Sequence, residues 1–414
     1  MSSKISATAL GAWLLVALYY FFQYALRSTP SVMIPQLSEA FGVSALGVSA
    51  IVGMFYYGYS PFNLVAGASI DRFGAKQIIP IGAALVGIGA IMFGTGNITA
   101  ANVGRFLQGA GGAFAMVGSV YLITKNFPAS VAASFIGATQ MFGMAGGSAG
   151  QFLVGPLIKS GLPWERFWVY AGIGGLIIAM LLFILLPREQ KVTSEVERGN
   201  FFTPLKIVFS NPQSILCGLI AGLLFIPTTI LAMTWGVRFL QEARGQEYEA
   251  AVGLAATVPL GWVIGCPLLG FVSDRLGRRK PVLMGGTIAL FLIVSWILFG
   301  NPAIFRGPAV GILMGIASGA AMLPNTIIKE ANPAKLGGTA TGVVNFINFT
   351  FSALLGPVFG ARLARSPDSS DVPGLEHHQS GFQPLLYGIF LALVLAFFLK
   401  ETGPATRTAN LNER

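Results

Sequence analysis

One arginine lies inside a long apolar segment near the start of the chain. Arg27 follows Tyr20, Gln23 and Tyr24 at the spacing i, i+3, i+4, i+7, so on a helix these four side chains share one face. A charge inside a membrane span costs roughly 2.5–3.5 kcal/mol on insertion scales and marks a functional site by default. All 16 acidic residues lie in loops, tails or span ends, so no carboxylate pairs with Arg27 at its depth.

The guanidinium group of Arg27 is suited to an anion. It binds a carboxylate or a phosphate through a bidentate fork of two parallel hydrogen bonds. We therefore predict that Arg27 binds an anionic solute, with Tyr20, Gln23 and Tyr24 beside it. The alternatives are an arginine that snorkels to the outer headgroups or one that backbone carbonyls hold.

Further polar side chains inside apolar segments are candidates for the same site. Asn345 and Asn348 are three residues apart and so face together on a helix, and Tyr57 lies in an earlier segment. We predict that these three side chains line the solute site. For each of them alone, a hydrogen bond between helices is the competing role.

The residues that most often carry metal or covalent chemistry give no such pattern here. His377 and His378 are the only two histidines and have no further ligands at fixed spacing, so we expect a solvated loop. Cys217 and Cys266 lie in apolar segments without metal-site spacing. No zinc-protease motif, membrane aspartate pair or nucleophile motif is present. The sequence predicts no metal site, no cofactor and no enzyme.

Composition places the chain in a lipid bilayer. Hydrophobic residues make up 54% of the 414 residues and charged residues only 10%, against about 25% charged residues in soluble domains. The mean hydropathy is +0.70. The net charge of +10 could suggest a nucleic-acid partner, but the positive residues lie mostly between apolar runs, where they act as topology signals. We predict an all-α membrane protein that binds no nucleic acid.

Twelve apolar segments are long enough to span the hydrocarbon core, which takes about 20 residues per span. The most polar stretch lies between the sixth and the seventh. We predict an N-terminal six-helix bundle over 1–186, a cytoplasmic linker over 187–210 and a C-terminal six-helix bundle over 211–414. A short amphipathic helix at Phe201–Phe209 is expected along the membrane surface. The predicted spans are Leu10–Leu37, Leu46–Ile70, Gln77–Phe93, Ala101–Ile123, Val131–Ile158, Phe167–Leu186, Ile215–Phe239, Ala251–Ser273, Pro281–Leu298, Ala309–Ile328, Ala340–Leu363 and Pro384–Leu399.

The distribution of lysine and arginine predicts the orientation. With the N-terminus inside, 17 of the 26 lysines and arginines fall in inner segments and 7 in outer segments. Because positive residues collect on the cytoplasmic side, both termini are expected in the cytoplasm, with the protein in the cell inner membrane. No cleavable signal peptide is apparent, and we expect a monomer.

An internal repeat relates the two halves. The segment Gly67–Lys76, with Asp71-Arg72, recurs as Gly270–Arg279, with Asp274-Arg275, at an offset of 203 residues. With this repeat, and with Arg105-Phe-Leu-Gln-Gly opening the fourth span, the chain resembles the major facilitator superfamily over essentially its whole length. The resemblance implies twelve transmembrane helices in two pseudo-symmetric six-helix bundles (the major facilitator fold) and transport by alternating access.

The resemblance also implies roles for the repeated motif. In the family the aspartate binds a helix end of the opposite half and closes the cytoplasmic side, which assigns gating to Asp71 and Asp274. Their implied ion-pair partners are Arg72 and Arg275, and Arg279 belongs to the same gating motif. The alternative is that these residues only anchor the loop on the positive side. Arg105 matches a family motif tied to ion coupling or conformational change, with an interfacial anchor as its alternative.

The first span is similar to that of the organophosphate:phosphate antiporters, where Tyr-Tyr and Arg have the same spacing, and sialin-type anion symporters also carry an arginine there. The second arginine of the phosphate antiporters is missing, because Ile226–Ile230 stands in its place. This favours a small organic anion with less charge, a carboxylate rather than a phosphate, with a proton or sodium as the coupling ion. The alternatives are a drug or cation efflux antiporter, whose fifth-span pattern is absent, and a transporter-like ligand sensor.

Overall fold

The structure is a computed structural model, and it describes residues 6–127, 129–187, 202–301, 307–333, 336–364 and 374–403. Within these ranges every regular element is a helix. The first half contains α1 (Ala7–Ser28), η1 (Thr29–Val32), α2 (Ile34–Phe41), α3 (Ala45–Phe73), α4 (Ala75–Phe93), α5 (Ile98–Asn126), α6 (Ala129–Phe152), α7 (Val154–Lys159) and α8 (Trp164–Leu185). The second half contains α9 (Phe202–Phe209), α10 (Pro212–Ile226), the π-helical η3 (Pro227–Trp235), α11 (Gly236–Glu242), α12 (Tyr248–Leu276), α13 (Lys280–Phe299), α14 (Pro308–Ser318), η4 (Gly319–Met322), α15 (Leu323–Glu330), α16 (Gly337–Ala364) and α17 (Leu375–Phe398).

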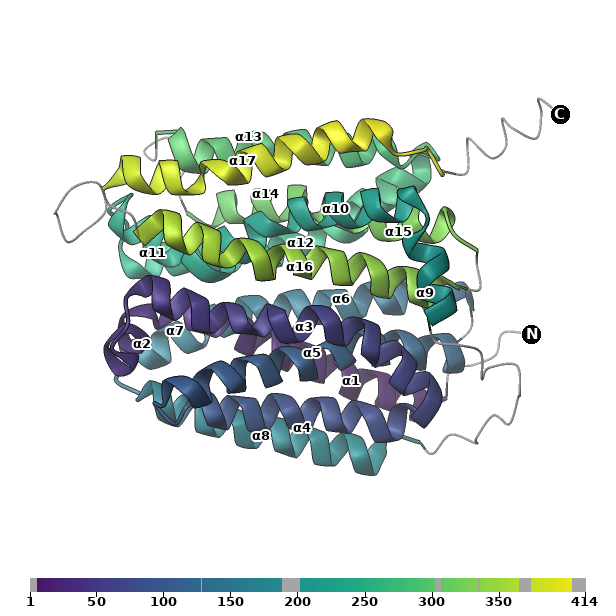
Figure 1. Ribbon diagram of the computed structural model, residues 1–414, viewed down its shortest axis with the longest axis horizontal. Coiled ribbons are helices and arrows are strands. Elements are labelled where there is room, and N and C mark those ends of the chain that lie inside the picture. The colour runs from purple at the N-terminus through teal and green to yellow at the C-terminus, as the bar shows by residue number, and fades with distance from the viewer. Residues whose placement is uncertain are drawn as a thin grey trace.

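The helices form two groups that lie side by side. In Figure 1 the first group, α1 to α8, lies below the second, α9 to α17. The groups meet mainly where α3 packs on α16 and where α6 packs on α12. Ser60 in α3 donates to the carbonyl of Phe346 in α16 at 2.8 Å. The short helix α9 confirms the helix predicted at Phe201–Phe209, whereas residues 188–201 of the predicted linker lie outside the described part of the chain.

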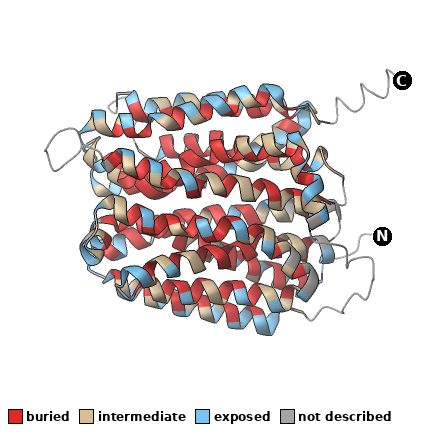
Figure 2. Cartoon of the chain, in the orientation of Figure 1, coloured by how far each residue is buried: buried red, intermediate tan, exposed pale blue. Residues whose placement is uncertain are grey.

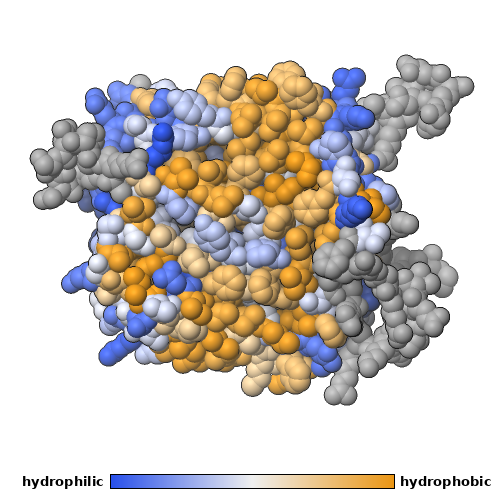
Figure 3. Space-filling view, viewed as in Figure 1, coloured by the Kyte–Doolittle hydropathy of each residue, from blue (hydrophilic) through white to orange (hydrophobic). Residues whose placement is uncertain are grey.

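Hydropathy divides the surface as a bilayer requires. Figure 3 shows hydrophobic residues across the middle of the molecule and hydrophilic residues gathered at its two ends. Ten described helices are long and apolar enough to cross a membrane, or eleven if α2 and α3, bent by 102° at their junction, count as one span. Figure 2 shows that burial concentrates on the faces that helices turn toward one another. The fold is therefore an all-helical membrane bundle.

Glycines allow α3 and α5 to approach until their backbones touch. A Cβ atom on Gly109 of α5 would lie 1.9 Å from the carbonyl oxygen of Phe55, and one on Gly58 of α3 would lie 2.2 Å from that of Phe106. Small residues at helix contacts permit such close packing in membranes. The contact fixes the rotation of α3, and with it the direction of its aromatic side chains.

The two groups are bridged at the end of the bundle that carries α2, α7 and α11, which we call the distal end (Figure 1). There Lys159 pairs with Glu249 at 2.7 Å, and the Tyr248 hydroxyl donates to the carbonyl of Val32 at 3.3 Å. Deeper in the bundle, the Gln151 amide of α6 donates to the carbonyl of Ala232 in η3 at 3.1 Å. A cavity of about 480 Å³, the distal cavity, opens between the groups at this end. Its wall includes Gln36, Lys159, Arg238, Gln241 and Glu242.

Candidate functional site

Arg27 lies in the last turn of α1 and is only 2% exposed. Its Nε donates a hydrogen bond to the Tyr56 hydroxyl at 3.2 Å. Its terminal nitrogens, Nη1 and Nη2, are buried and have no hydrogen-bond partner among the described residues. The side chain therefore does not snorkel to the surface, and backbone carbonyls do not hold it. The part of the guanidinium that can fork onto an anion is left free.

Six aromatic rings surround the guanidinium of Arg27, and we call them the aromatic cage. Their centroids lie 4.8–5.7 Å from its central carbon, within the range of cation–π attraction. Four rings come from α1 and α3, and two come from α10 and α16 of the second group. The charge therefore lies where the two groups meet. The rings belong to Tyr24, Phe55, Tyr56, Tyr59, Phe225 and Phe349.

The predicted neighbours of Arg27 on α1 are buried on the same face. Gln23 is 1% exposed, and both its amide oxygen and its amide nitrogen lack a described partner. Tyr20 donates to the side-chain oxygen of Gln140 at 3.2 Å, and its ring packs edge-on against Tyr24 at 4.9 Å. The spacing in the sequence thus located the buried face correctly, while the binding role of these side chains stays a prediction.

The structure places the candidate residues on the other helices in different environments. Asn348 of α16 is 8% exposed, precedes the cage residue Phe349, and has a buried side-chain oxygen without a described partner. Asn345, one turn earlier, is half-buried. Tyr57 is 39% exposed and lies on an outward stripe of α3 together with Val65, so the structure does not bring it to the cage. Its neighbour Tyr56, over which the sequence analysis preferred Tyr57, contacts Arg27 instead.

Arg105 of α5 is also buried, and none of its surface is exposed. Its Nη1 donates to the Leu26 carbonyl at 3.2 Å and to the Gln108 side chain at 2.8 Å, and its Nη2 donates to the Val52 carbonyl at 3.4 Å. Arg105 therefore ties α5 to α1 and α3 from inside the first group. This position excludes the alternative of an interfacial anchor, and its role in coupling stays a prediction.

The repeated motif shows a pairing that differs from the prediction. Asp71 and Arg72 lie at the end of α3, and their side chains are outside the described part of the chain. Asp274, at the end of α12, pairs with Nη1 of Arg279 at 2.5 Å. The expected pairing of Asp274 with Arg275 was wrong. Arg275 is exposed over the ring of Phe271, whereas the chain turns back after α12 and brings Arg279 to the carboxylate.

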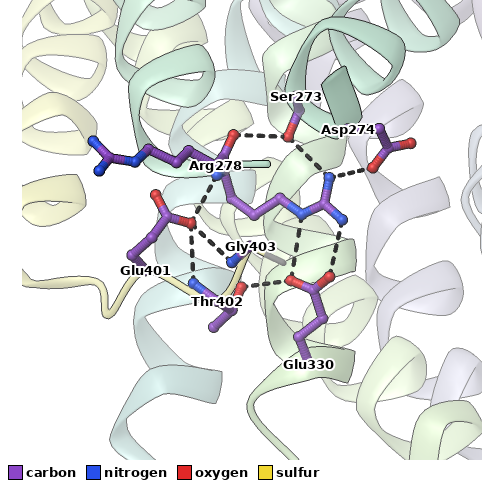
Figure 4. A network of polar contacts seen from close by, with 8 residues as sticks. Ser273, Asp274, Arg278, Glu330, Glu401, Thr402 and Gly403 are labelled. Atoms are coloured by element: carbon purple, nitrogen blue, oxygen red, sulfur yellow. Dashed lines mark hydrogen bonds and ion pairs between the residues drawn. The ribbon is translucent and has the colours of Figure 1, made fainter. Parts of the chain in front are cut away.

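Arg279 is the centre of a polar network, and Figure 4 labels its partners Ser273, Asp274 and Glu330. It also donates to Glu330 of α15 at 3.0 Å and to the Ser273 hydroxyl at 3.0 Å. Burial opposes its charge, but the hydrogen bonds to Glu330 and Asp274 outweigh burial and raise the pKa of Arg279. Every described partner of Asp274 and Arg279 lies in the second group. The described contacts therefore do not include the predicted link from Asp274 to a helix end of the opposite half.

The segment after α17 joins the same network. The carboxylate of Glu401 accepts hydrogen bonds from the backbone N–H groups of Arg279 at 2.7 Å and Lys280 at 3.1 Å, at the N-terminus of α13. Burial alone would raise the pKa of Glu401, but these bonds and those from Thr402 and Gly403 lower it. Glu401 thus caps α13 and holds the described segment after α17 against it (Figure 4).

The two histidines do not lie in a solvated loop, and that expectation was wrong. Both belong to α17, which begins at Leu375, well before the predicted span at Pro384. His378 is 4% exposed and lies 3.7 Å from Glu242 of α11. Among the described residues, no group of three potential metal ligands occurs.

Comparison with known proteins finds one matching family and several related transporters. A family model described as Major Facilitator Superfamily matches residues 16–357. The probable sulfoacetate transporter SauU of Cupriavidus necator is 22% identical, with 86% of this chain and 88% of that protein covered. The probable galactarate/D-glucarate transporter GudP of Escherichia coli is 23% identical, with 84% and 85% covered. The multidrug resistance protein Stp of Mycobacterium tuberculosis is 24% identical, with 84% and 74% covered.

Solved structures agree on the fold. A bacterial homologue of the human lysosomal transporter Spinster, solved in an inward-facing and unoccupied conformation, superposes with a TM-score of 0.71. The match covers 95% of this chain and 97% of that one, at 18% sequence identity.

Proposed function

The chain belongs to the major facilitator superfamily and is a secondary transporter, and we propose that it carries a small organic anion, a carboxylate in preference, bound by Arg27. The observation that carries the proposal is the free fork of Arg27. A buried donor without a partner costs about 1–3 kcal/mol, and more if it is charged. A carboxylate would accept from Nη1 and Nη2 together and remove that cost.

The aromatic cage favours one anionic group of low charge. Arg27 is the only described cation at its centre, and the neighbouring buried Arg105 donates through both terminal nitrogens to groups of its own bundle. Beyond the charge, the free amide of Gln23 offers a donor and an acceptor for a hydroxyl or a carbonyl of the solute. The anions named for SauU and GudP are small organic carboxylates, each with a second acidic group, and they support a carboxylate as the solute class of this chain.

The cage also suits alternating access. An anion at Arg27 contacts α1 and α3 of one group and α10 and α16 of the other, so its binding energy depends on how the groups are placed. We propose twelve spans in two bundles, 1–186 and 211–414. They are the eleven spans counted with α2 and α3 as one, and α6 as the twelfth. Both termini then lie in the cytoplasm. The distal end then faces outward, and its bridges between the groups close the outer side. The gating motif lies on the inner side, and Arg105 helps couple the movement.

Uptake into proteoliposomes tests the proposal. Purified protein is reconstituted and offered labelled acetate, pyruvate, D-glucuronate, D-glucarate, sulfoacetate and inorganic phosphate in turn. We expect uptake of at least one organic anion, and we expect Arg27→Ala to abolish it while leaving the protein folded. The matched control is Arg166→Ala, because Arg166 is an exposed arginine at the start of α8. Unchanged anion uptake in Arg27→Ala would show that the site assignment is wrong.

A drug exporter is the second candidate. The six rings of the cage and the similarity to Stp favour it, because aromatic walls also bind lipophilic cations. The buried charge of Arg27 opposes it, since a cation in the cage would lie beside another cation. Transport of tetraphenylphosphonium that no carboxylate inhibits would favour the exporter over the anion transporter.

A further inference from the structure

His378 and Glu242 face each other at the distal end without a hydrogen bond. His378 lies in the first turns of α17 and is 4% exposed, and Glu242 is the last residue of α11. Their closest atoms, Nε2 of the ring and Oε2 of the carboxylate, are 3.7 Å apart. This distance is too long for a hydrogen bond and too short for a bridging water.

The tautomer of His378 follows from its other ring nitrogen. Nδ1 lies 3.1 Å from the carbonyl oxygen of Gly374, which can only accept, so Nδ1 carries the hydrogen. In the neutral ring, Nε2 then carries a lone pair that points toward Glu242. The facing oxygen Oε2 is buried and has no described partner. Two acceptors thus oppose each other, and a single proton placed between them would satisfy both.

The described charged groups around this pair do not supply that proton. Arg238 of α11 binds the other oxygen of Glu242, Oε1, at 2.7 Å. Arg244, after α11, donates to the Gly300, Ile297 and Leu298 carbonyls at the end of α13. On α17 itself His377 contacts the Leu363 carbonyl of α16 at 2.6 Å, and Glu376 is exposed, as is Arg362 on α16.

Glu242 connects the pair to the distal cavity. Arg238 and Glu242 both form part of the wall of the distal cavity, which opens to solvent at this end of the bundle. A proton from solvent that bonds to Nε2 changes no other bond and creates an imidazolium that donates to Oε2. The Arg238–Glu242–His378 group then passes from a net charge of zero to +1. An anion entering the distal cavity meets that added charge.

We propose that His378 and Glu242 form a proton-binding site next to the distal cavity, whose wall includes Glu242, and that its protonation promotes capture of the anionic solute from that side. The second half of this proposal rests on the proposed function, whereas the first half does not. One added charge about 10 Å from an anion, at effective dielectric constants between 80 and 20, raises capture about 2- to 17-fold.

The proton site is tested by NMR titration, for which this chain is well suited because it has only two histidines. In full-length protein carrying His377→Gln, the one remaining imidazole belongs to His378. We expect this imidazole to titrate, and its midpoint to move to lower pH in Glu242→Gln, which removes the facing charge. Glu249→Gln removes a carboxylate from the Lys159 pair at the same end and should leave the midpoint in place. A ring that does not titrate, or a titration midpoint that is the same in Glu242→Gln as in the parent, would overturn the proposal.

The effect on capture is tested by initial uptake rates as the pH on the distal side is varied without a gradient. We expect the rate to rise as the pH falls through the midpoint, and the dependence to be lost in both His378→Gln and Glu242→Gln. The same pH dependence in these folded variants would overturn the role in capture. Arg27→Ala separates the two proposals, because it should abolish uptake at every pH while His378 still titrates.

Discussion

Replacing Arg27 by lysine keeps the positive charge and removes the planar fork. In the structure the guanidinium uses Nε for Tyr56 at 3.2 Å and leaves Nη1 and Nη2 for a solute. A lysine ammonium at the same place is a compact point charge that cannot present two parallel donors to one carboxylate. Arg27→Lys therefore isolates the contribution of geometry from that of charge.

The size of the effect can be worked out from the bonds involved. A hydrogen bond to a charged group contributes about 1.5–3 kcal/mol. If the solute carboxylate accepts from both terminal nitrogens of Arg27 and the lysine replaces only one of these bonds, the loss is about 1.5–3 kcal/mol. At about 1.4 kcal/mol per factor of ten, this corresponds to an affinity that is weaker by about 10- to 140-fold. Arg27→Ala should lose more, because the charge goes as well.

The assay is equilibrium binding of the labelled anion to purified protein, with thermal unfolding as the check that the variant is folded. The control is Arg166→Lys, the same chemical change at an exposed site, which should bind like the parent. Arg27→Lys that binds the anion within a factor of two of the parent would refute the bidentate geometry. The charge alone would then explain the site.

Two further predictions concern stability. Gly109→Ala places a methyl group 1.9 Å from the Phe55 carbonyl, so we expect the unfolding midpoint to fall, by overpacking of about 1–3 kcal/mol, whereas Gly137→Ala, with no atom within 4 Å, should leave it unchanged. Because folding lowers the pKa of Glu401, its contribution is present above its unfolded pKa of about 4.3 and is lost as the pH falls through the lower folded pKa. Glu401→Gln should therefore be less stable than the parent at pH 7, by about 0.5–1 kcal/mol after solvent screening, and the difference should shrink as the pH falls through the folded pKa, in pH-dependent thermal unfolding.

The membrane helices could be predicted from the sequence because lipid imposes a strong compositional signal on every span. The buried face of α1 was also predictable, because charged and polar side chains in an apolar helix must share the one face that avoids lipid. The same rule applies to α3, because Tyr56, Ser60 and Asn63 follow the spacing i, i+4, i+7 and all three are buried. The choice of Tyr57 overlooked this pattern. Close packing through Gly58 and Gly109 keeps that face turned inward.

Contacts that join distant parts of the chain were beyond the sequence. Phe225 and Phe349 complete the aromatic cage, but nothing in their local segments connects them with Arg27. The pairing of Asp274 with Arg279 depends on the turn that follows α12. His378 looked solvated because polar residues surround it in the sequence. Its burial depends on α11, which places Glu242 and Phe239 against it.

Arg27 and Arg105, two of the buried arginines, show what separates a binding site from a structural tie. Arg27 and Arg105 are both enclosed, and the ring of Phe55 lies 5.5 Å from one guanidinium and 5.1 Å from the other. Arg105 reaches the Leu26 carbonyl in the last turn of α1, where helix carbonyls have no partner of their own, and both of its terminal nitrogens are satisfied. Arg27 comes one residue after Leu26 and points into the aromatic rings, where no described acceptor meets its fork. Residue type and depth are the same, so neither identifies the solute site. The partners of the two terminal nitrogens do, because both are bonded in Arg105, whereas in Arg27 neither has a described partner.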